Sequence, residues 1–445
     1  MNFSDARLTR RLGLLMSALA AAPTESIPGA CGSWAATKAA YRFLDSEQVT
    51  PEAIREGSRA AVLERIAGQP AVLVLQDTTE INLTQHRKTA GLGYLDGKYQ
   101  WGLKAHTSLV VSLEGVPQGV VAQHVWARDP EERRKSKERR QRFTSEKESQ
   151  RWLDALRRSE QALPAEIGVI TVADREADIY DLFAQPRRTG SELLIRASHD
   201  RKVTHPEAAY LWAAARRAEV AGTLTVQVGR RPGQEPRTAR VEVQPPHHAK
   251  QRSQLRPRAL QVLLAEELTP PEDVAAPICW LLLTTLPVDS YAVAAQMVRW
   301  YATRWLIERY HFTLKSGCGL EELQLRTSER LERALAVLGL VAWRLMWLLY
   351  AARRHPEQPC SVALEPHEWQ ALWARTHRTD QIPAAPPTLA EALLWIAKMG
   401  GFLARKGDNQ PGLKTLWRGW RHLHDSAVIW QLTHSTPPSS LSTCG

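Results

Sequence analysis

The order of apolar and polar residues predicts helices at both ends of the chain and a mixed segment between them. Within residues 1–66, leucines recur at the spacing of a helix: Leu8, Leu12, Leu15 and Leu19. Segments 35–43 and 51–66 show the same helical pattern, so no strand is predicted there. Residues 290–352 again favour long helices, and residues 388–432 predict a final helical unit rich in tryptophan.

Short apolar runs predict strands in the middle of the chain. The run 71–75 predicts a buried strand that stops at the polar residues 76–79. The runs 107–113 and 116–125 lie so close together that they predict a hairpin. Together these runs predict three antiparallel strands.

Two further patterns extend this α/β reading. Residues 167–172 predict another buried strand, which leads directly into an acid and a short helix. Residues 191–286 alternate apolar runs with turn-rich polar stretches and predict an all-β insertion. In the helical part, 334–352 is the most apolar stretch, yet Arg344 lies near its middle, where a charge in lipid costs roughly several kcal/mol. We interpret it as a buried helix.

The composition is that of a folded protein with a polyanionic partner. Its 445 residues suffice for several domains, and 44% hydrophobic with 24% charged residues argue against wholesale disorder. Lysine and arginine number 58 against 47 acidic residues, a net charge of +11 that favours nucleic acid or an anionic membrane. The five cysteines form no CxxC pair, so neither a zinc ribbon nor a disulfide framework is indicated and a reducing cytoplasm fits.

Two segments, one apolar and one charged, allow alternative interpretations. Residues 12–22 superficially suggest a signal peptide, but Asp5 and the missing cleavage pattern favour an amphipathic helix. Residues 128–151 are crowded with Arg, Lys and Glu, which marks a solvated helix or a mobile linker.

The candidate chemistry starts from acids at the ends of predicted strands. Asp77 and Asp174 each follow an apolar run, where open α/β sheets place their active sites. A third acid, Glu308, shares one polar helix stripe with Tyr301, Arg304, His311 and Lys315. A solvated face is the ordinary explanation of such a stripe. Here apolar positions flank it on both sides, so a carboxylate there needs partners.

Carboxylates suit hard cations such as Mg²⁺ or Mn²⁺. Two such ions would activate a water and stabilise the leaving 3′ oxygen in phosphodiester cleavage. Arg304 and Lys315 would then hold phosphates.

The strings around these residues resemble a known family. They are LQDTT at Asp77, ADREADIY at Asp174, and YATRWLIERYHFTLK, which contains the signature Y-x2-R-x3-E-x6-K. From Phe3 almost to Trp430 the chain resembles the DDE transposases of bacterial insertion sequences. More specifically, it resembles the insertion-sequence-four family, in the branch that includes the transposase of transposon five.

The resemblance implies a fold class and an organisation. It implies an α/β fold with a ribonuclease-H-like catalytic core and a β-rich insertion, flanked by an N-terminal helical DNA-binding region and a C-terminal helical dimerisation region. The expected parts are 1–66 for binding the DNA end, 67–190 for the first part of the core, 191–286 for the insertion, 287–360 for the second part with the signature helix, and 361–445 for dimerisation.

It also implies roles for single residues. The family's catalytic and metal-binding acids correspond to Asp77, Asp174 and Glu308, with two Mg²⁺ or Mn²⁺ ions per active site. Its DNA-contacting signature residues correspond to Tyr301, Arg304 and Lys315, and His311 matches as well.

Three further strings match the family. Trp280 in CWLLLT corresponds to a tryptophan that holds a flipped base during hairpin formation, although a buried strand tryptophan explains it as well. Lys38, Tyr41 and Arg42 match a string that touches the transposon end, although a basic helix face is also ordinary. MGGFLARKGDNQPGLKTLWRGW resembles the dimerisation segment, and we interpret its tryptophans as helix-packing core.

We therefore expect a cut-and-paste DNA transposase that binds inverted-repeat ends and target DNA as a homodimer. It would need no membrane and would act in the bacterial cytoplasm at the nucleoid. Two alternatives stay open, a catalytically silent DNA-binding inhibitor of the same fold and a metal-dependent nuclease without strand transfer. Members usually carry a longer stretch ahead of FSDARLTRRL, so a truncated start is expected, which suggests the first alternative.

Overall fold

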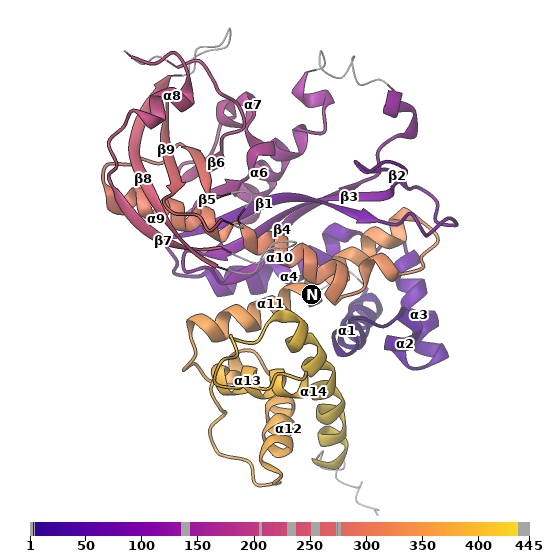
Figure 1. The fold of residues 1–445 in the computed structure, drawn as a ribbon. Helices are drawn as coiled ribbons and strands as arrows, with labels where there is room; N and C mark the ends of the chain where they lie inside the picture. Colours follow the sequence, from indigo (N-terminus) through magenta and orange to yellow (C-terminus); the bar gives the residue numbers. More distant parts are fainter. Residues whose placement is uncertain are drawn as a thin grey trace, which may run out of the picture. The chain divides into compact units, whose positions relative to one another are not determined.

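The computed structural model describes residues 3, 5–134, 143–203, 207–228, 237–250, 259–272, 274 and 277–434. The chain forms two compact units (Figure 1). The helical unit consists of Met1–Gly57, Phe312–Leu325 and Glu329–Gly445, and the sheet unit consists of Ser58–His311 and Arg326–Ser328.

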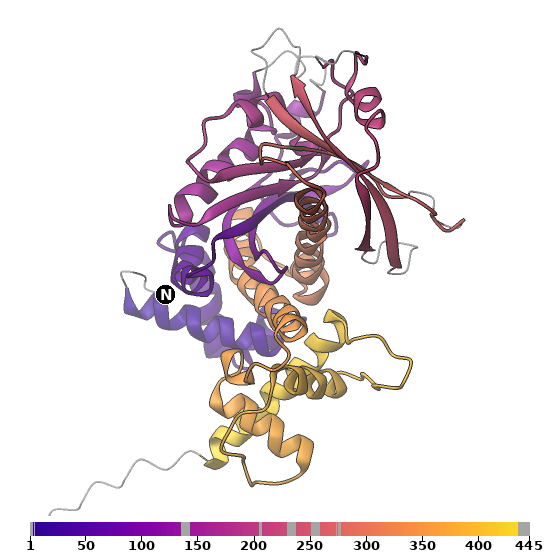
Figure 2. The same cartoon turned by 90° about the vertical axis from the view of Figure 1, so that its left-hand side faces the viewer.

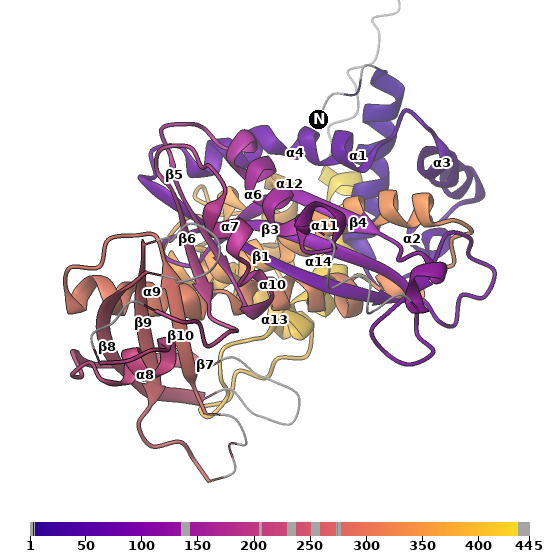
Figure 3. The same ribbon diagram turned by 90° about the horizontal axis from the view of Figure 1, so that it is seen from above.

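The sheet unit is built on one continuous sheet. Among the described residues its strands are β1 (Ala71–Asn82), β2 (Gly93–Tyr94), β3 (Trp101–Ser112), β4 (Pro117–Trp126), β5 (Gly168–Ala173), β6 (Ser191–Arg196), β7 (Gly222–Val228), β8 (Arg237–Lys250), β9 (Ala259–Glu267) and β10 (Cys279–Thr284). Their order across the sheet is β2-β3-β1-β5-β6-β10-β9-β8-β7, and β4 pairs with β3 (Figure 3). The helices of this unit are most of α4 (Pro51–Ile66), α6 (Gln150–Ala162), α7 (Tyr180–Ala184), α8 (Leu211–Arg216), α9 (Tyr291–Thr303) and α10 (Trp305–Phe312).

The pairing of the strands explains the fold class. β1 runs antiparallel to β3 and β3 antiparallel to β4, which confirms the three predicted antiparallel strands and their hairpin. On its other side β1 runs parallel to β5, and β5 runs parallel to β6. This mixed sheet agrees with a ribonuclease-H-like core.

One strand is longer than the sequence predicts. The parallel pairing of β1 with β5 ends at Gln76 opposite Ala173, near the predicted stop. Its antiparallel pairing with β3 continues to Asn82 opposite Gly102. The prediction that the strand stops at 76–79 is therefore wrong, because the polar residues beyond Gln76 keep a backbone partner on the β3 side.

The β-rich insertion shares the sheet and the core of the rest of the unit. β6, the first strand of the insertion, pairs with β5 of the core and with β10, and β10 also pairs with β9, so the insertion extends the same sheet (Figure 2). Leu264 and Leu281 of the insertion belong to one buried cluster with Trp152 of α6 and Phe183 of α7. The predicted all-β character needs correction, because the helix α8 lies in this segment and its Leu211 joins the cluster.

The segment around the basic run lies partly outside the described residues. Short 3₁₀ helices cover Pro130–Arg134 and Thr144–Glu146, and α6 begins at Gln150. The solvated helix or linker expected for 128–151 includes residues 135–142, which lie outside the described part.

The helical unit buries the leucine stripe of the N-terminus. Its helices are α1 (Ala6–Ala21), α2 (Ile27–Cys31), α3 (Trp34–Asp45), α11 (Ser328–Arg354), α12 (Pro366–His377), α13 (Leu389–Met399) and α14 (Leu413–His434). The four leucines of α1 are buried, as the helical spacing predicts. Among the described residues α11 is the one helix long and apolar enough to cross a membrane, and 83% of its apolar stretch is buried inside the protein. Arg344 in α11 forms an ion pair with Glu368 at 3.1 Å, which confirms a buried core helix.

Two glycines bring α13 and α14 into backbone contact. A Cβ on Gly419 would lie 1.7 Å from the Ile396 carbonyl oxygen, and a Cβ on Gly400 would lie 1.9 Å from the Thr415 carbonyl oxygen. Because no side chain fits at either position, the helices can pack this closely only with glycine there. Trp417 and Trp420 are buried beside this crossing, so they are packing residues, as expected.

Candidate active site

The two aspartates lie at one edge of two neighbouring parallel strands. Asp77 is the first residue of β1 beyond its pairing with β5, and its side chain is 18% exposed. Asp174 follows β5 directly and caps the 3₁₀ helix Arg175–Ala177, with its Oδ1 accepting a hydrogen bond from the Glu176 amide at 2.9 Å. Since β1 and β5 run in the same direction, both carboxylates lie at the carboxyl-terminal edge of this parallel pair.

Glu308 lies on α10 and is bound by a cation. Its carboxylate Oε1 lies 2.5 Å from Nη2 of Arg304, one helical turn earlier, and its side chain is 53% exposed. The Arg304 guanidinium also lies over the Tyr301 ring, 6.0 Å from its centroid. Glu308 is thus the most exposed of the three acids.

The signature segment is not one regular helix. α9 ends at Thr303, Arg304 follows it as the cap, and α10 begins at Trp305. After α10 the chain forms a π-helical turn, Thr313–Gly317, closed by the Cys318 amide donating to the Thr313 carbonyl at 2.8 Å. The single straight stripe predicted from 301 to 315 is therefore wrong, because each break changes the angle between successive residues.

The acids act on one another electrostatically. Burial raises the pKa of Asp77 and Arg304 lowers it, while the charges of Asp174 and Glu308 raise it; the net result is a pKa of about 7. Burial would lower the pKa of Arg304, but Tyr301, Glu308 and the two aspartates outweigh it and raise that pKa. The structure therefore brings these three predicted acids into one electrostatic site around Arg304.

The raised pKa of Asp77 gives a pH dependence of stability in the absence of metal. The pKa of Asp77 is 3.8 in the unfolded state and about 7 in the folded state, so between these pH values only the folded state keeps the proton. The contribution of Asp77 to the free energy of unfolding therefore falls as the pH rises through that interval. At 1.36 kcal/mol per pKa unit the loss is at most about 4 kcal/mol. We expect Asp77→Asn to remove this contribution and to raise the melting temperature of the metal-free protein at pH 8.

The measurement is the melting temperature of both proteins from pH 4 to 8 in a chelating buffer. Asp289→Asn, at an exposed carboxyl of the same unit, is the control for loss of one charge. Parallel curves for wild type and Asp77→Asn would contradict the prediction.

The donor set fits a divalent cation by its chemistry. Three carboxylates at one site are the ligands that Mg²⁺ and Mn²⁺ prefer, and a cation would offset the repulsion that raises the Asp77 pKa. Within the described part of the chain, no three His, Cys, Asp or Glu side chains lie close enough together to hold a metal ion. To act as the third metal ligand, Glu308 would have to release Arg304 and bind the cation instead.

The aromatic residues of the site are buried. Tyr301 is 3% exposed and Trp280 on β10 is 8% exposed. Their rings meet edge to face with centroids 5.0 Å apart. The structure thus places Trp280 beside the signature residue Tyr301, in a packed position that fits the buried-strand alternative; a role in holding a flipped base stays a prediction.

His311 and the N-terminal residues lie in different surroundings. Nδ1 of the buried His311 lies 3.8 Å from Oδ2 of Asp77, so His311 belongs to the site. Lys38 and Arg42 are exposed and Tyr41 is half-buried on α3 of the helical unit. The remaining signature residue, Lys315, is half-buried within the π-helical turn.

One residue of the site was missed by sequence reasoning. Arg151 donates from Nε to the Thr78 hydroxyl at 2.9 Å and from Nη2 to the Glu176 carboxylate at 2.6 Å. Thr78 follows Asp77, and the Glu176 amide binds Asp174, so Arg151 links the two segments that carry the aspartates. Arg151 lies at the end of the charged segment 128–151, and only the folded chain shows which groups it joins.

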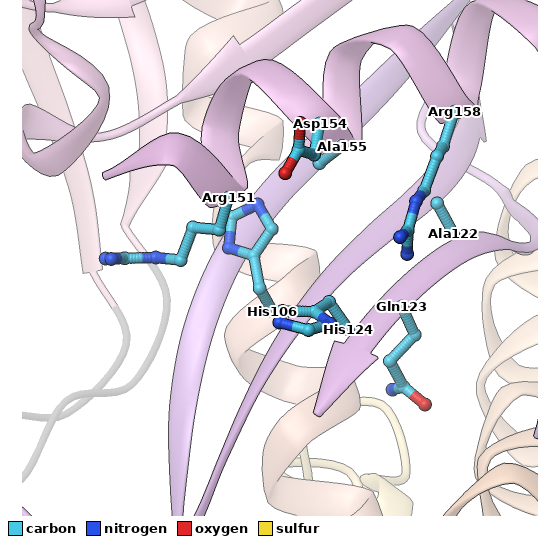
Figure 4. Close-up of a pocket in the computed structure, with 8 residues that line it drawn as sticks. All are labelled: His106, Ala122, Gln123, His124, Arg151, Asp154, Ala155 and Arg158. Carbon is cyan, nitrogen blue, oxygen red and sulfur yellow. The ribbon is translucent and has the colours of Figure 1, made fainter. Parts of the chain in front are cut away.

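A small cavity lies between α6 and the β3–β4 hairpin (Figure 4). Its volume is about 40 Å³, and its lining residues are His106, Ala122, Gln123, His124, Arg151, Asp154, Ala155 and Arg158. That volume accommodates water molecules but no nucleotide. None of the three acids lines it, so the cavity is not the catalytic site.

Three family models match the chain. The model described as Transposase DNA-binding matches residues 1–49, Transposase DDE domain matches residues 68–344, and Transposase Tn5 dimerisation domain matches residues 340–431. The second match covers more than half of the chain and contains all three acids. The matches follow the order of N-terminal helices, mixed sheet and C-terminal helices in the fold.

Proposed function

This chain belongs to the DDE transposases, a family of DNA-acting nucleotidyl-transfer enzymes, and from that premise we propose that it moves its own element by a cut-and-paste reaction. The observation that supports this most directly is the electrostatic influence of Asp174, Glu308 and Arg304 on Asp77. The family matches support DNA binding and homodimer formation. We propose that the homodimer pairs two inverted-repeat ends, in the bacterial cytoplasm at the nucleoid, with the five-part organisation set out above.

The proposed site residues have distinct tasks. Asp77, Asp174 and Glu308 would hold two Mg²⁺ or Mn²⁺ ions, which when bound supply a charge that favours attack on phosphorus and departure of the 3′ oxygen. The charge of Arg304 lowers the pKa of Asp77, and we propose that this residue binds a DNA phosphate after releasing Glu308. Lys315 would bind a second phosphate. The Arg304 guanidinium lies over the Tyr301 ring, and this contact would hold the guanidinium in place.

The proposed reaction consists of in-line phosphoryl transfers without a covalent protein intermediate. Water first cleaves the phosphodiester at each end and leaves a 3′ hydroxyl. That hydroxyl then attacks the opposite strand, which gives a hairpin end, and water reopens the hairpin. The released 3′ hydroxyl finally attacks a phosphodiester of the target, so that one bond to phosphorus forms as another breaks.

The test is a cleavage and joining assay with DNA taken from the flanks of the chain's own reading frame. The proposed function predicts nicked, hairpin and joined products on a denaturing gel. A gel shift without cleavage would favour the silent inhibitor, and nicks without hairpin or joined product would favour the nuclease. Inverted repeats that bracket the reading frame would identify the ends.

Removal of the two proposed phosphate ligands should weaken DNA binding in a salt-dependent way. We expect Arg304→Ala and Lys315→Ala each to lower the affinity for end DNA and to flatten its salt dependence by roughly one unit per lost contact. Arg304→Ala should also lower cleavage, since it frees Glu308 and removes an opposing charge from Asp77. The measurement is the affinity for end DNA from 50 to 200 mM salt. If the slope of log affinity against log salt is the same in wild type and in both variants, Arg304 and Lys315 are ordinary solvated side chains that contact no phosphate.

A further inference from the structure

A basic and aromatic surface lies beyond the acids on the same strand. Two loops form it, residues 83–92 after β1 and residues 95–100 before β3 (Figure 1, the β2 end of the sheet). We call its exposed members the basic-aromatic edge: Arg87, Lys88, Lys98, Tyr99 and Trp101. None of these residues takes part in the site described above.

The aromatic side chains of this edge are unusually exposed. Tyr99 is 70% exposed and Trp101 is 36% exposed. The ammonium of Lys98 lies 5.1 Å from the centroid of the Tyr99 ring, so a cation and a ring are presented together. Such a pair suits a phosphate-bearing partner better than an apolar one.

The backbone holds this edge in a fixed conformation. Tyr99 has a φ of 67°, a left-handed conformation that costs free energy for a side chain other than glycine. The two loops are tied together, because the Trp101 amide donates to the Thr84 hydroxyl at 3.0 Å and the Leu83 amide donates to the Trp101 carbonyl at 2.8 Å. The rings are therefore displayed by a structured turn.

The charge of this edge is positive because its acids are already paired. Lys104 lies 2.8 Å from the Asp96 carboxylate and 3.4 Å from that of Glu80, and Arg128 also pairs with Asp96. Arg87, Lys88 and Lys98 add exposed positive charge in these loops. A polyanion is the matching partner.

The distance to the acids fits duplex DNA. β1 continues for five residues from Asp77 to Asn82, where the first of the loops begins. At about 3.4 Å per residue this is about 17 Å, close to the length of five base pairs of B-DNA. A duplex with one phosphodiester at the acids would therefore reach the edge about half a helical turn away.

We propose that the basic-aromatic edge binds the target DNA beside the phosphodiester that is attacked; this rests on the proposed function. Lysine binds phosphate as a point charge, and an aromatic ring packs against sugar or base without reading a sequence. Such contacts suit a partner whose sequence varies. Recognition of the end sequence, in contrast, belongs in the proposed function to residues 1–49, which match the Transposase DNA-binding model.

The test is the double variant Lys98→Ala/Tyr99→Gly. Glycine accepts the left-handed conformation of residue 99, so this variant should fold. Arg217→Ala removes one exposed cation elsewhere in the same unit and is the matched control. Each protein is assayed for gel shift of end DNA, nicking of flanked ends, joining of pre-cleaved ends to a plasmid, and binding to an unrelated 20-base-pair duplex.

We expect end binding and nicking to be unchanged and joining from pre-cleaved ends to fall by roughly eightfold or more at about 0.1 M salt, which is the loss of one phosphate contact. Binding of the unrelated duplex should weaken in the double variant and not in the control. Joining and duplex binding equal to wild type would overturn the proposal. Reduced nicking of flanked ends with normal joining would instead show that the edge binds the DNA that flanks the element before excision, not the target. If the wild-type chain joins no DNA, the proposed function fails, and the duplex comparison still decides whether the edge binds DNA.

Discussion

Replacing Asp174 with alanine is expected to abolish Mg²⁺-dependent nicking of end DNA while DNA binding survives. Asp174 is a proposed metal ligand and not a proposed phosphate ligand, so mainly the chemical step should suffer. Loss of several kcal/mol of transition-state stabilisation corresponds to a fall of about a thousandfold or more. Cleavage kinetics and a gel shift on the same end DNA measure the two effects separately.

A second substitution separates metal binding from the structural role of this side chain. Asp174 Oδ1 also caps the helix Arg175–Ala177 by accepting from the Glu176 amide. Asp174→Asn keeps an oxygen for that hydrogen bond but removes the charge, so it should fold as wild type and still fail to nick. Asp289→Ala is the control. Near-normal nicking by Asp174→Asn would remove Asp174 from the list of metal ligands.

Replacing Gly419 with alanine is expected to destabilise the C-terminal helices strongly. The added Cβ would lie 1.7 Å from the Ile396 carbonyl oxygen, and a backbone atom cannot rotate away as a flexible side chain could. We expect α13 and α14 to separate, at a cost of about 3 kcal/mol or more, together with loss of the dimer. Thermal unfolding followed by circular dichroism and sedimentation velocity are the measurements.

The chain supplies a matched control for this substitution. A Cβ on Gly412 meets nothing within 4 Å, so Gly412→Ala should melt and dimerise as wild type. If Gly419→Ala behaved like Gly412→Ala, the close crossing of the two helices would be disproved. A variant that melts early but still dimerises would show that dimerisation does not depend on this crossing.

Local patterns predicted much of the fold and the positions of the aspartates. The apolar run before Asp174 corresponds to β5, and the leucines of α1 are buried as their spacing requires. Strand length was not predictable, since β1 continues past Asp77 only because β3, some thirty residues later, pairs with it. The same holds for Arg151, whose role depends on two segments that are distant from it in sequence.

The helical stripe of the signature was predicted less well. An angle of 100° per residue assumes an unbroken α-helix, whereas the backbone is interrupted at Arg304 and again at Thr313–Gly317. Tertiary contacts decide such breaks. The resemblance of the YATRWLIERYHFTLK string to a family signature identified these residues in spite of the wrong geometry.

β6 pairs with β5 of the core on one side and with β10 on the other, so an insertion in sequence is not an independent folding module. If the part of the insertion that follows β6 were deleted, β6 would lose its antiparallel neighbour and become an unprotected edge, a template for aggregation. The buried cluster would also be opened, because residues from both parts fill it. Core and insertion are therefore expected to unfold cooperatively. A substitution in one of them should change the melting temperature of the other.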